Sequence, residues 1–131
     1  MEQKQSNSGQ EQKPFVKLSV NELTAIGYVL FPYAQFVHRI IPPSRERGRI
    51  LVIIERLRKR IASLQSSYVN GQEEQFPITE EELGVIDAAL GTFLESVHRF
   101  IPQSTQRDET IRTCNNLRQY LVSALDTRKI R

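Results

Sequence analysis

Apolar residues recur at steps of three and four along four segments of the chain, which is the spacing of one face of an α-helix. They are Leu23, Ile26, Leu30, Ala34, Val37 and Ile41, then Leu51, Ile54, Leu57, Ile61 and Leu64, then Leu83, Ile86, Leu90, Leu94, Val97 and Ile101, and last Ile111, Cys114, Leu117, Leu121 and Ala124. The pattern predicts an all-α protein with four amphipathic helices.

The chain also resembles itself. Residues 19–64 align with residues 79–124 without a gap, and 14 of the 46 aligned positions are identical. Both segments contain the string V-H-R-x-I-P-x-S-x-x-R, which chance matching of amphipathic helices does not readily produce. We interpret the chain as two tandem copies of one helical hairpin.

Helix start signals agree between the copies. Ser19 is followed after three residues by Glu22, and Thr79 by Glu82. This is the spacing of a capping box, in which two side chains satisfy free backbone N–H groups at a helix start. An Ile-Pro dipeptide ends the first helix of each copy, because the residue before a proline is disfavoured in the α region. The serines that follow at 44 and 104 are suited to cap the second helices.

These signals define the expected organisation. A hairpin with an apolar stripe on both arms can bury it by facing a second hairpin, so we expect an antiparallel four-helix bundle made of two tandem-duplicated helical hairpins. The expected segments are a disordered segment 1–14, one helical domain 15–125 with hairpins 19–65 and 79–125 joined by a linker 66–77, and a frayed basic tail 126–131.

Composition narrows the class of protein. The chain has 131 residues, 39% of them hydrophobic and 25% charged, which is typical of a globular domain. Its first residues have no apolar run of the kind found in a secretory leader, and no run approaches the roughly 20 residues needed to cross a bilayer. The single cysteine excludes an internal disulfide. We expect a cytoplasmic protein with no membrane contact.

No recognisable catalytic chemistry stands out. The repeated histidines, His38 and His98, precede arginines at predicted helix ends, where cations favour the negative end of the helix dipole. Cys114 falls on an apolar stripe and is expected to be buried. No phosphate-binding glycine motif occurs. We therefore expect no enzyme activity, no cofactor, no metal and no small-molecule substrate.

Divergence between the copies points to a binding surface. The first copy has Tyr28, Phe31, Phe36, Ile50 and Ile53 where the second has Ala88, Gly91, Ser96, Thr110 and Thr113. The second copy keeps its apolar stripes without these side chains, so three roles remain for them: contacts between the hairpins, packing of the segment around Phe15, or an external interface. The leading expectation is a non-catalytic interaction protein, an adaptor or small subunit, that docks a protein partner or a second copy of itself through these residues.

Charge provides an alternative. Residues 1–71 hold 11 Lys and Arg against 5 Asp and Glu, and residues 72–131 hold 7 against 10. Such asymmetry marks either a nucleic-acid surface or a charge-complementary contact. The basic residues of the second predicted helix could follow a phosphate backbone. The candidate nucleic-acid contacts are Arg45, Arg49, Arg56, Lys59 and Arg60.

Overall fold

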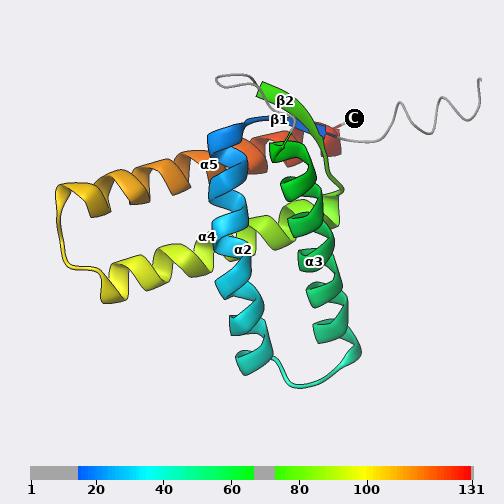
Figure 1. Ribbon diagram of the computed structural model, residues 1–131, viewed down its shortest axis with the longest axis horizontal. Coiled ribbons are helices and arrows are strands. Elements are labelled where there is room, and N and C mark those ends of the chain that lie inside the picture. Colours follow the sequence, from blue (N-terminus) through cyan, green and yellow to red (C-terminus); the bar gives the residue numbers. More distant parts are fainter. Residues whose placement is uncertain (1–14, 67–72, 131) are drawn as a thin grey trace, which may run out of the picture.

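The computed structural model describes residues 15–66 and 73–130 of the chain (Figure 1). Its elements are β1 (Phe15–Ser19), α2 (Val20–Ile40), α3 (Arg45–Gln65), β2 (Glu73–Pro77), α4 (Glu80–Phe100) and α5 (Thr105–Ile130). The all-α prediction is confirmed, with the addition of one small sheet. The expectations for residues 1–14 and for residues 67–72, half of the linker, lie outside the described residues. Of the predicted tail, residues 126–130 belong to α5.

The predicted helix starts are present. Ser19 accepts a hydrogen bond from the backbone N–H of Glu22, whose carboxylate accepts one from the backbone N–H of Ser19. Thr79 and Glu82 form the same reciprocal pair. The hydroxyl of Ser44 caps α3 by accepting from the backbone N–H of Arg47. Each interaction satisfies backbone donors that a helix start otherwise leaves free.

The helices form two pairs that cross. In Figure 1, α2 lies alongside α3 and α4 lies alongside α5. The second pair runs across the first. Helix α4 packs on both α2 and α3 at the crossing. The expected four-helix bundle with one common axis is therefore not confirmed. The buried residues of α2 are Leu23, Ile26, Val29, Leu30 and Val37, so most of the contact of this helix with the core comes from its first half.

A two-stranded sheet covers one end of the crossing. Strands β1 and β2 are antiparallel, with Val16 opposite Phe76. Val16, Leu18 and Phe76 are buried, so one face of the sheet belongs to the core. The sheet was not predicted, and the linker 66–77 that we expected contains β2. On the free edge of β1, the hydroxyl of Tyr120 bonds both the N–H and the carbonyl of Lys17.

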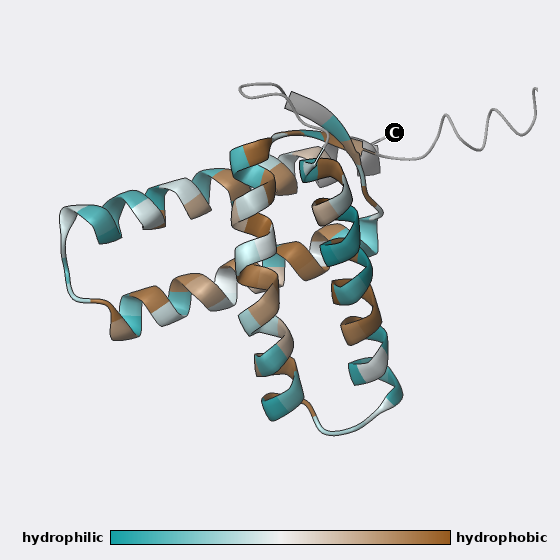
Figure 2. Ribbon diagram, in the orientation of Figure 1, coloured by the Kyte–Doolittle hydropathy of each residue, from teal (hydrophilic) through white to brown (hydrophobic). Residues whose placement is uncertain are grey.

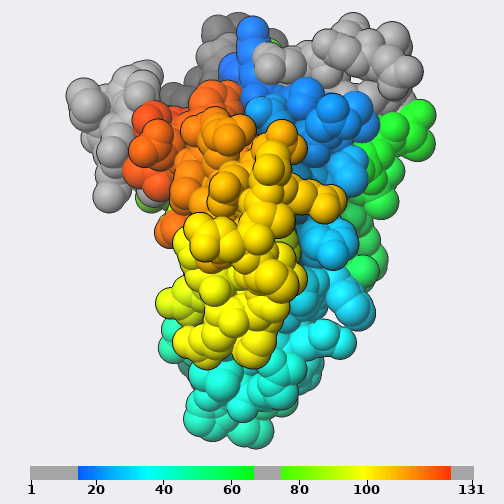
Figure 3. Space-filling model, turned by 90° about the vertical axis from the view of Figure 1, so that its left-hand side faces the viewer, coloured from blue at the N-terminus to red at the C-terminus, as the bar shows by residue number. Residues whose placement is uncertain are grey.

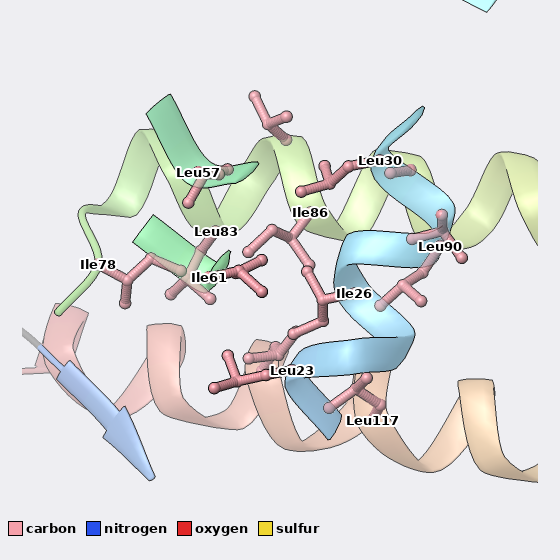
Figure 4. Close-up of a cluster of buried hydrophobic side chains, with 14 of the residues drawn as sticks. Leu23, Ile26, Leu30, Leu57, Ile61, Ile78, Leu83, Ile86, Leu90 and Leu117 are labelled. Carbon is pink, nitrogen blue, oxygen red and sulfur yellow. The ribbon is translucent and has the colours of Figure 1, made fainter. Parts of the chain in front are cut away.

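The core lies where the pairs cross. Side chains from all four helices converge there, as shown in the close-up of Figure 4 and by the brown segments facing the crossing in Figure 2. Leu23, Ile26 and Leu30 of α2 are fully buried. By contrast, Ile40 and Phe100 at the far ends of the pairs are exposed. Each pair therefore has a buried base and a projecting end, and Figure 3 looks at the end of the α4–α5 pair.

Candidate functional site

An aromatic groove lies where α2 and α4 diverge beyond the crossing. Its volume is about 560 Å³, within the range of protein sites that bind other molecules. Five aromatic side chains line it: Tyr28, Phe31, Tyr33 and Phe36 from α2, and Phe93 from α4. We use the name aromatic groove for the hollow lined by these rings. The two helices cross steeply (Figure 1), and all the lining residues come from α2 and α4.

Four of the five rings pack against one another in two pairs. Tyr28 and Phe93 meet edge to face across the two helix pairs, with ring centroids 6.1 Å apart and an interplanar angle of 85°. Tyr33 and Phe36 stack at 6.1 Å and 17°. Both geometries are favourable for aromatic pairs. Two rings remain open to solvent, since Tyr28 is 70% exposed and Phe31 is 52% exposed. Burial raises the pKa of the Tyr33 hydroxyl.

One charged side chain lines the aromatic groove, and it is Arg39, near the end of α2. The other polar lining groups are neutral and include Gln35, Thr92 and Ser96. No carboxylate is among the lining residues that the structure describes. The ion pairs formed by the described side chains of residues 15–66 and 75–124 do not include Arg39. The aromatic groove therefore combines a large apolar surface with one uncompensated positive charge.

Three of the five predicted partner-binding residues meet at this site. Tyr28, Phe31 and Phe36 lie together in the aromatic groove. Tyr33, Phe93 and Arg39 complete it, and the sequence pattern did not single them out. Spacing on α2 is the signal that was available for Arg39, which lies on the same helix stripe as Tyr28 and Phe31.

The other two residues do not belong to this site. Ile53 is 3% exposed and belongs to the core, so its placement on an external interface was wrong. Ile50 is partly buried against the same core. Both lie beside Val85 and Glu81 of α4, because α3 packs on α4 at the crossing. Of the three roles we considered, contact between the hairpins is the one that fits Ile53.

The basic residues of α3 also face α4. Arg49 forms an ion pair with Glu81, and Arg56 contacts the Glu82 carboxylate at 3.1 Å. Arg60 contacts Glu82 at 2.9 Å and donates a second hydrogen bond to the carbonyl of Pro77 at 2.8 Å. Three of the five candidate nucleic-acid contacts are thus paired with carboxylates of the acidic copy. Part of the charge asymmetry of the sequence is therefore explained by ion pairs between α3 and α4 within the chain.

Arg45 and Lys59 are the two remaining candidates. Neither makes an ion pair within the described part of the chain, and both are exposed. They are 14 positions apart on α3, a rise of roughly 21 Å along the axis. Of the five candidate contacts, two separate positive charges therefore have no carboxylate partner among the described residues, and the paired residues Arg49 and Arg56 lie between them.

Glu82 is the one charged residue buried among those described, with 1% exposure. It completes the capping box with Thr79 and accepts hydrogen bonds from Arg56 and Arg60. Burial alone would raise the pKa of this carboxyl, but the bonds from Arg60, the Thr79 backbone N–H and Arg56 outweigh it, so the pKa is lowered. Glu82 is ionised at neutral pH and ties α3 to the start of α4.

Arg58 and its counterpart Arg118 contact different side chains. Arg58 lies over the ring of Phe31, with its guanidinium carbon 5.3 Å from the centroid. Its counterpart Arg118 bonds both carboxylate oxygens of Asp87, at 2.8 and 3.2 Å, and lies beside Gly91. Arg58 also lies 3.6 Å from the Glu55 carboxylate, so both arginines have an acidic partner, and Arg58 has the ring of Phe31 in addition.

The other candidate reactive groups occupy structural positions. The hydroxyls of Ser44 and Ser104 accept hydrogen bonds from helix starts. Cys114 is buried, and burial raises the pKa of its thiol. An Arg107 nitrogen lies 3.1 Å from Nδ1 of His98, and since arginine only donates, the ring accepts. Among the described residues, no three His, Cys, Asp or Glu side chains form a group that could hold a metal ion.

Comparisons with protein-family models, with curated proteins and with solved structures give no significant match to this chain. No helix within the described ranges combines the length and apolarity needed to cross a membrane. The aromatic groove is consequently the feature on which a functional argument can rest.

Proposed function

We propose that this chain is a non-catalytic interaction protein, an adaptor or small subunit of a larger assembly, which docks a partner protein in the aromatic groove. The observation that carries the proposal is a hollow of about 560 Å³ lined by five aromatic rings, two of them largely exposed. Contiguous exposed aromatic surface is enriched at protein interfaces. The proposal keeps Tyr28, Phe31 and Phe36 of the predicted docking surface and leaves out Ile50 and Ile53 on α3.

We further propose that the fold arose by tandem duplication of one hairpin. The support is the shared string, the two capping boxes, and the equal length of α2 and α4, which each have 21 residues. On this view, the first copy acquired Tyr28, Phe31 and Phe36, three of the five rings of the aromatic groove. The counterparts of Tyr28, Phe31 and Phe36 are small residues, so the second copy provides natural control positions for each ring.

Site-specific photocrosslinking tests the docking surface. A photoreactive phenylalanine replaces Tyr28 in one form of the full chain and Ala88, its exposed counterpart, in another. Both are expressed in the native cells and irradiated. We expect a defined adduct from position 28 and none from position 88. Purified partner should then bind the parent chain and lose affinity by about tenfold or more with Phe31→Ala, because truncation of a central aromatic contact commonly has that effect. Equal adducts from both positions would refute the proposal.

Nucleic-acid binding through α3 is the second candidate function. Arg45 and Lys59 favour it, because they are exposed and have no carboxylate partner among the described residues. Binding to duplex and single strands should then be weak and should fall steeply with salt. The Arg45→Glu/Lys59→Glu variant should lose it and remain folded. Absence of binding at low salt in the parent chain would remove this candidate and leave the docking proposal untouched.

A further inference from the structure

The aromatic groove has the dimensions of a helix-binding site. Its α2 wall runs from Tyr28 through Phe31 and Gln35 to Arg39, which is one stripe of the helix over about three turns, or roughly 17 Å. Its α4 wall runs from Ala89 to Ser96, again on one stripe. The α4 wall is shorter, roughly 10 Å. Two helical walls of about two and three turns can accept part of the apolar face of a third helix.

Charge restricts which helix would fit. A docked apolar segment removes water from the aromatic groove, and a positive charge that loses water without a partner is strongly unfavourable. Arg39 is the charged lining residue, and the described lining offers it no carboxylate. An occupant with a suitably placed Asp or Glu would satisfy Arg39, whereas a Lys or Arg at that place would be repelled.

We infer that the aromatic groove binds an amphipathic α-helix of a partner protein, with its apolar face on the rings and an acidic side chain paired with Arg39. The inference rests on the proposed docking function and specifies the partner's chemistry. It also assigns Arg39 as the residue that sets the orientation and charge preference of the bound helix. Tyr28 and Phe31 contribute most of the contact area, because they are the rings with the most surface left to bury.

The internal repeat offers a matched control. Arg99 is the counterpart of Arg39, is exposed like it, and does not line the aromatic groove. Replacing either residue by glutamine removes the same charge from the same kind of helix end. A difference between Arg39→Gln and Arg99→Gln therefore reports the site and not the net charge of the protein.

A displayed library of amphipathic helices tests the inference directly, because selection does not require the partner to be identified. The helices have about four turns, with fixed apolar positions on one face and random residues at both ends. They are selected against the full-length parent chain, Arg39→Gln, Arg99→Gln and Phe31→Ala. We expect Asp and Glu to be enriched at one end of the helices selected by the parent and by Arg99→Gln. Selected helices should bind Arg39→Gln about tenfold more weakly or worse, as for loss of a charge-assisted hydrogen bond.

The outcomes separate the inference from the proposal beneath it. If the selected helices need Phe31 but show no acidic preference, or lose no affinity with Arg39→Gln, the inference is wrong and docking in the aromatic groove stands. If no helix from the library depends on Phe31, the inference is wrong, and the photocrosslinking result decides the docking proposal. If the parent chain self-associates and Phe31→Ala abolishes this, the occupant is a second copy and the inference is likewise overturned.

Discussion

Removing the charge of Glu82 should lower the free energy of unfolding far more than removing the charge of its counterpart, Glu22. Both Glu22 and Glu82 complete capping boxes, and glutamine can serve in a capping box as well. Glu82→Gln therefore keeps the cap and removes the charge that faces Arg56 and Arg60. The matched variant Glu22→Gln removes a carboxylate that makes no ion pair within the described residues.

The size of the difference follows from burial. Removing one partner of a buried ion pair commonly costs about 3–5 kcal/mol. Here Glu82 is 1% exposed, but the Arg56 and Arg60 side chains are 50% and 26% exposed and can regain water. We therefore expect Glu82→Gln to lower the free energy of unfolding by about 2–3 kcal/mol. Glu22→Gln should change it by no more than about 0.5 kcal/mol.

The effect should depend on pH in a defined direction. Because the pKa of Glu82 is lowered in the folded protein, its charge stabilises the fold above the unfolded-state pKa of about 4.3. This stabilisation is lost as pH falls through the folded-state pKa. Urea unfolding followed by far-UV circular dichroism should show the full penalty of Glu82→Gln at neutral pH and a smaller one below about pH 4. Equal penalties for both variants at neutral pH, or a penalty for Glu82→Gln that does not change with pH, would refute the assigned ion pairs.

Three further predictions concern packing and reactivity. Ile53→Ala should lower the free energy of unfolding by about 2–5 kcal/mol, while Val52→Ala at its exposed neighbour should change it by less than about 0.5 kcal/mol; urea unfolding measures both, and similar values would contradict the burial of Ile53. Gly84→Ala should raise the melting temperature, because a Cβ there meets no atom within 4 Å and alanine is favoured over glycine inside a helix by about 0.5–1 kcal/mol; a decrease in calorimetry would show a contact that the structure lacks. Cys114 should react slowly with a thiol reagent in the folded protein and rapidly in urea, because the native thiol is buried and its pKa is raised; fast native labelling would place it at the surface.

Local sequence signals predicted where the helices begin and end. They could not predict that the two helix pairs cross. Capping boxes and proline positions are decided by a few neighbouring residues, so Ser19, Thr79 and the helix ends could be predicted. The angle between the two helix pairs depends on which part of the apolar stripe of each helix is covered by the other pair. The stripe of α2 runs from Leu23 to Ile41, but its buried part is concentrated before residue 31. Periodicity gives the direction of a stripe and not how much of its length another helix covers.

An alternation of apolar and polar residues in the sequence indicated the small sheet, but the stronger helical pattern made it hard to recognise. Residues 15–19 alternate between exposed and buried positions, with Val16 and Leu18 inward, which is the period of a strand. Phe76 and Ile78 alternate in the same way on the other strand and in the residue after it. Both runs are short and lie directly before capping boxes. Leu18 and Ile78 therefore fit equally well as residues that precede a helix, and the strand period is visible only when the two runs are compared.

The positions of Arg56 and Arg60 show how the two helix pairs differ. Their counterparts in the second copy are Asn116 and Tyr120, and Tyr120 bonds the backbone of β1 instead of an acidic residue. The α3–α4 contact is thus fixed by charges that the other copy does not repeat, so the two pairs are not interchangeable. An asymmetric crossing leaves one angle between α2 and α4 that α3 and α5 do not fill. The aromatic rings of the first copy line that angle, and Tyr33 among them also packs against the core. If the chain docks a partner as proposed, the differences that fix how the pairs cross also decide which surface the partner meets.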